Sequence, residues 1–200
     1  MKAKLLTAAF SAAILSACSS EAAGPFDGKS AEEVVSYLLF GLEDKASVTM
    51  DTLTVSTEAT QAKPLSLVVK MQEGSNSEDA LRATVETSDN CTFTVAMKPL
   101  AINERVGLKD AKFSVDLTNV TAVEVGRGKN MKLPGAKIMC LEAAEDVWCK
   151  AVSEESTTGR WGLRVGPFEK ENPETPVKSI QEKANQALSY FKANICKPKV

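Results

Sequence analysis

Between residues 47 and 165 the chain carries short stretches in which apolar and polar residues alternate, with no helical segment between them. Alternation with a period of two is typical of a strand with one buried face. Parallel strands need a long crossover, usually a helix, so the pattern excludes βαβ units. It predicts an antiparallel meander of about eight strands. The expected strands lie at residues 48–57, 65–71, 81–85, 91–97, 112–117, 121–125, 136–141, 147–152 and 161–165.

A helical period replaces the strand period on both sides of this region. Ser30 and Glu33 have the spacing of a capping box, in which the serine hydroxyl and the glutamate carboxylate satisfy free amides of a first helical turn. An amphipathic helix is therefore predicted over residues 31–43, with its apolar stripe against a core. The stripe consists of Val34, Val35, Leu38, Leu39 and Leu42.

A second helix is predicted after Pro173 and Pro176, since proline is tolerated at a helix start. Its apolar face would consist of Val177, Ile180, Ala184, Ala187, Leu188, Phe191 and Ile195. The fold class that follows is α+β: an N-terminal helix, the meander, and a C-terminal helix packed on the open face of the sheet.

The first 17 residues have the pattern of an export signal. Lys2 and Lys4 precede an uncharged run of 13 residues, and Leu15-Ser16-Ala17-Cys18 ends it. This leader resembles that of bacterial lipoprotein precursors, whose lipobox places an aliphatic and two small residues before a cysteine. The resemblance implies cleavage before Cys18 and a diacylglyceryl group on its Sγ atom. It also implies outer-membrane placement, because Ser19 stands where an aspartate would retain the protein at the inner membrane.

The leader also admits two other interpretations. An ordinary secretory signal would be cut further on, after Ala22 or Ala23. A spanning helix needs about 20 apolar residues, more than this run offers. The preferred organisation is a signal peptide at residues 1–17, a lipidated tether at 18–25 and one α+β domain at 26–200.

Charge argues against nucleic acid and against electrostatic binding to membranes. The whole chain has 24 basic and 26 acidic residues, and the leader removes two lysines and no acid. The mature chain then has a formal charge of −4, without the basic excess that phosphate-rich partners require. The expected partners are the membrane, through the lipid, and a protein of the envelope.

Once Cys18 is assigned to lipid, Cys91, Cys140, Cys149 and Cys196 remain. Four cysteines in an oxidising compartment indicate two disulfides, with three possible pairings. Cys140 and Cys149 flank a polar turn between two expected strands, which favours their pairing. Cys91 would then join Cys196 and close a loop of about 105 residues, worth close to 4.7 kcal/mol in the chain-entropy model.

Motifs for chemistry are mostly excluded. The chain has no histidine and no Cys-x-x-Cys, so serine–histidine catalysis, most metal sites and redox catalysis lack their residues. No cofactor, no metal and no enzymatic activity are expected. The segment Arg160-Trp161-Gly-Leu-Arg164 has a composition found at binding hot spots, although a core tryptophan flanked by outward arginines is the preferred interpretation.

The mature part also loosely resembles small exported β-rich domains with a Cys-Thr-x-Thr strand, a Leu-x-x-Val segment and a final helix ending in cysteine. The matching segments are Cys91-Thr-Phe-Thr94, Leu117-Thr-Asn-Val120 and residues 187–196. That resemblance implies a fold and no activity.

Two functional hypotheses follow. The first is a lipid-anchored envelope protein with a non-enzymatic binding or structural role. The alternative is a small periplasmic hydrolase or ligand carrier with a pocket between sheet and helices.

Overall fold

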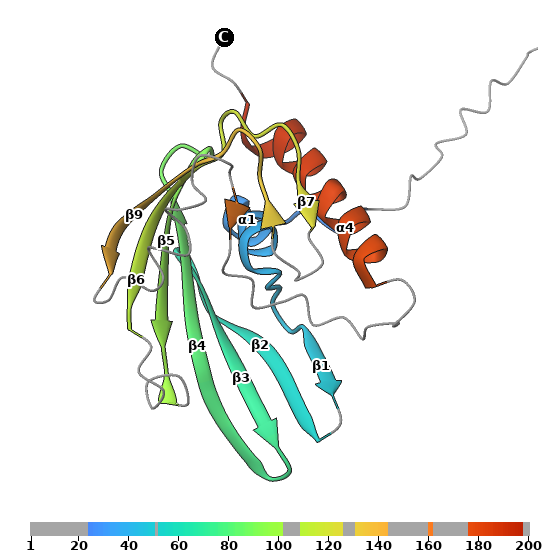
Figure 1. Cartoon of the computed structure of the whole chain (residues 1–200), viewed down its shortest axis with the longest axis vertical. Helices are drawn as coiled ribbons and strands as arrows, with labels where there is room; N and C mark the ends of the chain where they lie inside the picture. Colours follow the sequence, from blue (N-terminus) through green and yellow to red (C-terminus); the bar gives the residue numbers. More distant parts are fainter. Residues whose placement is uncertain are drawn as a thin grey trace, which may run out of the picture.

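The computed structural model describes residues 24–50, 52–101, 109–125, 131–143, 160–161 and 176–197, which form an α+β fold (Figure 1). The helices are α1 (Ala31–Phe40) and α4 (Pro176–Tyr190), and α4 continues into the π-helical turn η2 (Phe191–Ile195). The strands are β1 (Ser47–Met50), β2 (Leu53–Ala62), β3 (Leu65–Glu73), β4 (Asn76–Thr87), β5 (Thr92–Pro99), β6 (Ala111–Asp116), β7 (Glu124–Val125), β8 (Met131–Lys132), β9 (Lys137–Ala143) and β10 (Arg160–Trp161).

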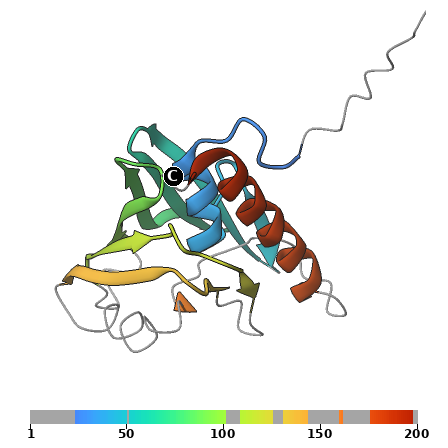
Figure 2. The same ribbon diagram turned by 90° about the horizontal axis from the view of Figure 1, so that it is seen from above.

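The main sheet has seven antiparallel strands in the order β1-β2-β3-β4-β5-β6-β9 and curves around α1 (Figures 1 and 2). Its concave face is apolar because every second residue points inward. Phe93 and Val95 on β5 lie opposite Val115 and Phe113 on β6, and all four are almost fully buried. These inward side chains and α1 share one core.

The strands differ from the expected single meander of about eight. The expected strand 48–57 is split between β1 and β2, which pair with each other. After β6 the chain leaves the main sheet, and β7, β8 and the later strand β10 form a separate three-stranded sheet. Between β8 and β10 the chain returns to the main sheet as β9, beside β6. The expected strand 147–152 lies outside the described residues.

The segment between β6 and β7 packs inward as a loop. Leu117, Val120 and Val123 on it are buried, so the expected strand 121–125 is reduced to β7. The Thr121 amide donates to the Pro134 carbonyl at 2.7 Å. Gly135 (φ +87°) lies so close that a Cβ would stand 1.9 Å from the Asn119 carbonyl oxygen, so only glycine fits there.

Helix α1 begins where the capping box predicts and ends earlier than expected. The Glu33 amide donates to Ser30 Oγ at 3.2 Å, and the Ser30 amide donates to Glu33 Oε2 at 2.8 Å. Gly41 adopts the left-handed conformation and its amide donates to the Tyr37 carbonyl. This cap stops the helix at Phe40 rather than at residue 43.

The buried surface of α1 is wider than the expected apolar stripe. Eight of the ten residues of α1 are buried, Ser36 and Tyr37 among them. The reason is a third layer: α1 contacts β4 on one side and α4 on the other (Figure 2). Helix α4 therefore lies on α1 and β7, not directly on the open face of the main sheet as expected.

Gln181 attaches α4 to the edge of the small sheet. Its side chain accepts from the Val125 amide and donates to the Val123 carbonyl, both at 2.8 Å, as a neighbouring strand would. The predicted inward residues Ile180, Ala184, Ala187, Leu188 and Phe191 are buried.

At its end the C-terminal helix reaches the main sheet. In η2 the Cys196 amide donates to the Phe191 carbonyl, five residues back. This wider turn advances the inward face by one residue, so Cys196 is buried and Ile195 only partly so. The predicted disulfide Cys91–Cys196 is confirmed. Cys140 is disulfide-bonded as well, and Cys149, its expected partner, lies outside the described residues.

We expect Cys196→Ala to lower the free energy of unfolding by about 2 to 5 kcal/mol, because the bridge closes a long loop in the unfolded chain. Denaturant titration of the oxidised protein measures this loss. Cys91→Ala should cost about the same, and the double variant should cost little more than either single variant. Two fully additive losses would contradict a shared bridge as their cause.

Candidate functional site

A cleft of about 270 Å³ lies between α1 and the β2–β3 hairpin. Three stretches of chain meet there: the turn before α1, the segment after α1, and the ends of β2 and β3. Its lining consists of Phe26, Lys29, Ser30, Glu33, Leu42, Glu43, Asp44, Ala59, Ala62, Lys63, Leu65 and Leu67.

The floor of the cleft is apolar. Leu42, Leu65 and Leu67 are almost fully buried, and Phe26 packs its ring 5.3 Å from the Tyr37 ring. On β2 the cleft is lined by the small residues Ala59 and Ala62, on either side of a register shift in the pairing with β3. Small side chains at these positions leave the hollow open.

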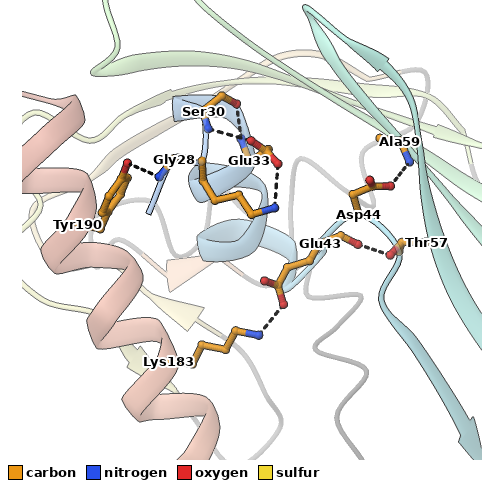
Figure 3. A network of polar contacts seen from close by, with 10 residues as sticks. Gly28, Ser30, Glu33, Glu43, Asp44, Thr57, Ala59, Lys183 and Tyr190 are labelled. Atoms are coloured by element: carbon orange, nitrogen blue, oxygen red, sulfur yellow. Dashed lines mark hydrogen bonds and ion pairs between the residues drawn. The ribbon is translucent and has the colours of Figure 1, made fainter. Parts of the chain in front are cut away.

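The segment after α1 forms one wall because it is tied to β2 (Figure 3). The Asp44 carboxylate accepts from the Ala59 amide at 2.7 Å. The Thr57 hydroxyl donates to the Glu43 carbonyl. The Lys45 amide donates to the Thr57 carbonyl at 3.0 Å.

Glu33 stands on the opposite wall, at the first turn of α1. Its carboxylate accepts from the Ser30 amide and from Lys29 Nζ, the latter at 3.0 Å. Burial raises the pKa of Glu33, but the bonds from Ser30 and Lys29 outweigh it and hold the pKa below the ordinary 4.5. Glu33 is therefore an ionised structural group. A general acid would need a raised pKa.

Glu43 and Lys183 link the cleft wall to α4 (Figure 3). Lys183 Nζ lies 2.5 Å from Glu43 Oε2, and both side chains are about one-quarter exposed (26%). The same ammonium lies 5.1 Å from the centre of the Tyr37 ring, within range of a cation–π contact. One lysine thus joins α4, α1 and the segment after α1.

Lys63 and Asp44 are the charged lining groups without a partner of opposite charge among the residues that the structure describes. Lys63 lies at the turn between β2 and β3 and is exposed, and its carbonyl accepts from Gln61 Nε2 at 2.8 Å. The Asp44 carboxylate accepts from a neutral group, the Ala59 amide. The described lining thus has two lysines and three carboxylates, and no excess of positive charge.

A second hollow, of about 480 Å³, lies between residues 24–27 and the outer side of α4. It is lined partly by the small or polar residues Asn185, Ser189 and Ala193. At its base the Gly28 amide donates to the Tyr190 hydroxyl at 3.2 Å, and Asp27 accepts from the Gly24 amide. These bonds hold the start of the domain against α4.

The residues that the sequence singled out lie elsewhere. Arg160 and Trp161 form β10 and pair with Lys132 and Met131 of β8, and their role as a partner surface stays a prediction. Arg164 and Cys18 lie outside the described residues.

Neither a metal site nor a membrane span is found in the described ranges. No three histidine, cysteine, aspartate or glutamate side chains gather there to hold an ion. None of the helices in those ranges has the length and apolar character needed to cross a bilayer.

Comparisons with protein-family models, with curated proteins and with solved structures find no match to this chain.

The sequence alone led only to a general alternative, a pocket between sheet and helices, and did not identify the lining residues, because they come from separate stretches with no shared motif. In the sequence, Ser30 and Glu33 have the pattern of a helix cap and Leu42 has the pattern of a core residue. The one signal in the sequence is the run Gly41-Leu-Glu-Asp44, where a helix-ending glycine precedes an apolar residue and two acids.

We expect Glu33→Gln to reduce the free energy of unfolding at pH 7 by about 0.5 to 1 kcal/mol. Because the folded pKa lies below 4.5, the contribution of the carboxylate is complete above pH 4.5 and is lost as the pH falls through the folded value. The gap to wild type should therefore close toward acid pH in denaturant titrations. Ser30→Ala should lower stability by about 1 kcal/mol and keep the acid dependence, since its backbone amide remains. A gap that stays constant from pH 7 to pH 3 would refute this role of Glu33.

We expect a double-mutant cycle of Glu43→Gln and Lys183→Met to give a coupling energy of about 0.5 to 1 kcal/mol, near the upper end for ion pairs that water reaches. Thermal or denaturant unfolding of the four proteins measures it. Lys178 and Glu182, 4.0 Å apart on the exposed side of α4, are the matched control and should couple by less than about 0.5 kcal/mol. Equal coupling in the two cycles would show that the Glu43–Lys183 pair has no special role.

Proposed function

We propose that this chain is a lipid-anchored envelope protein whose folded domain has a non-enzymatic binding role. The observation that carries the binding role is the cleft of about 270 Å³ beside α1 with its apolar floor. The non-enzymatic part is supported by the structural partners of the carboxylates in the cleft. Glu33 holds the Ser30 amide and Lys29, Asp44 holds the Ala59 amide, and Glu43 holds Lys183. Groups fixed in this way position structure, and the lowered pKa of Glu33 makes it a poor general acid.

The anchor is supported by the lipobox residues Leu15 to Cys18. Five residues lie between Cys18 and Gly24, the first described residue, so the tether spans at most about 20 Å. Phe26 lies two residues beyond Gly24 and lines both hollows. A domain held by Cys18 would thus keep its cleft close to the lipid surface, on the periplasmic side of the outer membrane or at the cell surface.

The second candidate, a periplasmic hydrolase or ligand carrier, is favoured only in its carrier form. A pocket between sheet and helix is what that hypothesis requires, and the cleft beside α1 lies there. Hydrolysis would need an activated nucleophile or a free acid–base pair. The carrier form agrees with the binding role, and it needs no reaction step.

We expect Cys18→Ser to abolish lipid attachment, because acylation requires the thiol. The variant should leave the membrane fraction or accumulate with its leader uncleaved, whereas the wild type should fractionate with membranes. Intact-mass analysis of the wild type should show the mass of the acyl groups on a chain beginning at Cys18. Cys140→Ser is the control and should stay membrane-bound. A Cys18→Ser protein that fractionates as wild type, together with an unacylated wild-type mass, would exclude the anchor.

A further inference from the structure

The apolar floor of the cleft beside α1 restricts what can enter it. Leu42, Leu65 and Leu67 line the floor with aliphatic carbon, and Phe26 adds an aromatic face. A sugar or a nucleotide would lose hydrogen bonds with water on such a floor and gain none. The part of an occupant that touches the floor is therefore hydrocarbon.

The charged groups around the cleft do not favour an amphiphile with an anionic head group. The lining has three carboxylates, on Glu33, Glu43 and Asp44, and two ammonium groups, on Lys29 and Lys63. Two of these carboxylates have lysine partners, whereas that of Asp44 has only an amide partner. A free fatty acid or an acidic phospholipid would bring one more negative charge to this lining. A hydrocarbon chain that is joined through a neutral ester brings none.

The size of the cleft restricts the occupant to one chain. Its volume of about 270 Å³ lies just below the usual range of ligand pockets, which starts near 300 Å³. A whole two-chain lipid does not fit a hollow of this size. One chain of a larger lipid fits if the rest of that lipid stays outside.

The lipid anchor proposed for this chain would be attached next to the cleft. The diacylglyceryl group on Cys18 would carry two acyl chains through neutral esters, on a tether that spans up to about 20 Å before Gly24. The Cα atoms of Gly24 and Phe26 are at most about 8 Å apart, since two residues separate them. Phe26 lines both the cleft and the hollow that Gly24 lines. The tether is therefore longer than the gap between its end and the cleft.

We propose that the cleft binds one of the two acyl chains on Cys18, with the hydrocarbon against Leu42, Leu65 and Leu67. The inference rests on the anchor and the binding role proposed above, and it names the occupant of the site. Because chain and cleft belong to one molecule, they meet at an effective concentration of about the millimolar range that short linkers give. The other acyl chain remains in the bilayer, so the bound chain turns the cleft side of the domain toward the lipid surface.

Photocrosslinking of the full acylated chain in its own membranes tests the proposal. The photo-reactive residue p-benzoylphenylalanine takes the place of Lys63, which lines the cleft and is exposed. We expect irradiation to join the peptide around position 63 to the lipopeptide that begins at Cys18, in a product with the mass of one chain. Mass spectrometry of the digested product identifies the joined peptides. The same residue in place of Lys98, an exposed lysine outside the cleft lining, is the control and should give no such product.

Filling the cleft should remove the crosslink. Ala59→Phe and Ala62→Trp place a large side chain at lining positions on β2, one half-buried and one exposed. Each should lower the yield of the lipopeptide product at least about tenfold, the effect of losing about 1.4 kcal/mol of binding free energy. Their unfolding midpoints should stay near that of the parent. An unchanged yield in both folded variants would place the acyl chain near Lys63 but outside the cleft, and would overturn the assignment.

Three other outcomes would overturn it. If intact-mass analysis shows acylation but no lipopeptide product forms, the anchor stands and the cleft does not hold its chain. Products that contain phospholipid or another protein in place of the lipopeptide would give the cleft a different occupant. A lipopeptide product with the mass of two chains would assign the acyl chain to a second copy. An unacylated wild-type mass would instead remove the anchor itself, so the two failures are distinguishable.

Discussion

Burial of α1 inside the curved sheet is the constraint on which the rest of the structure depends. Val34, Val35, Leu38 and Leu39 are fully inaccessible to water, and so is Tyr37 on the side toward α4. A helix that is apolar on nearly all sides cannot remain at a surface. The main sheet covers one side, and α4 must cover the other. The chain therefore closes its core only when its two distant helical segments meet.

The C-terminal helix is held against the rest of the core at its C-terminal end and along its length. At one end the disulfide and the contact of Phe93 with Phe191, whose ring centres lie 6.1 Å apart, fix η2 to β5. Along the helix Gln181 replaces a missing strand partner of β7, and Lys183 bridges to Glu43. The covalent link acts by limiting the unfolded chain, whereas the polar contacts act in the folded state. The two kinds of restraint are therefore complementary.

Local patterns in the sequence were enough for the helix start at Ser30, the inward faces of β4 to β6, and the pairing of Cys91 with Cys196. Each of these depends on neighbouring residues or on cysteine counting. The break between β1 and β2, the departure of β7 and β8 from the main sheet, and the wide turn η2 were not predictable in this way. They depend on what packs against each segment. Leu117 and Val120, for example, are buried in the core, although the residues around them have the pattern of strands. The cleft is even harder to predict from local sequence patterns, because it is a space between separate elements.

The existence of that space has a physical explanation in the placement of α1. The helix packs over β4, and the end of β2 at Ala59 and Ala62 is less completely covered. Ala59 and Ala62 are the side chains that would have to be larger to fill the gap. Unfilled apolar space forfeits dispersion contacts, and substitutions that fill such hollows are among the common ways to stabilise a protein. Two alanines on the wall of a leucine-floored hollow leave out packing that a larger side chain would supply. A ligand with an apolar part would supply those contacts, which agrees with the binding role proposed for the domain.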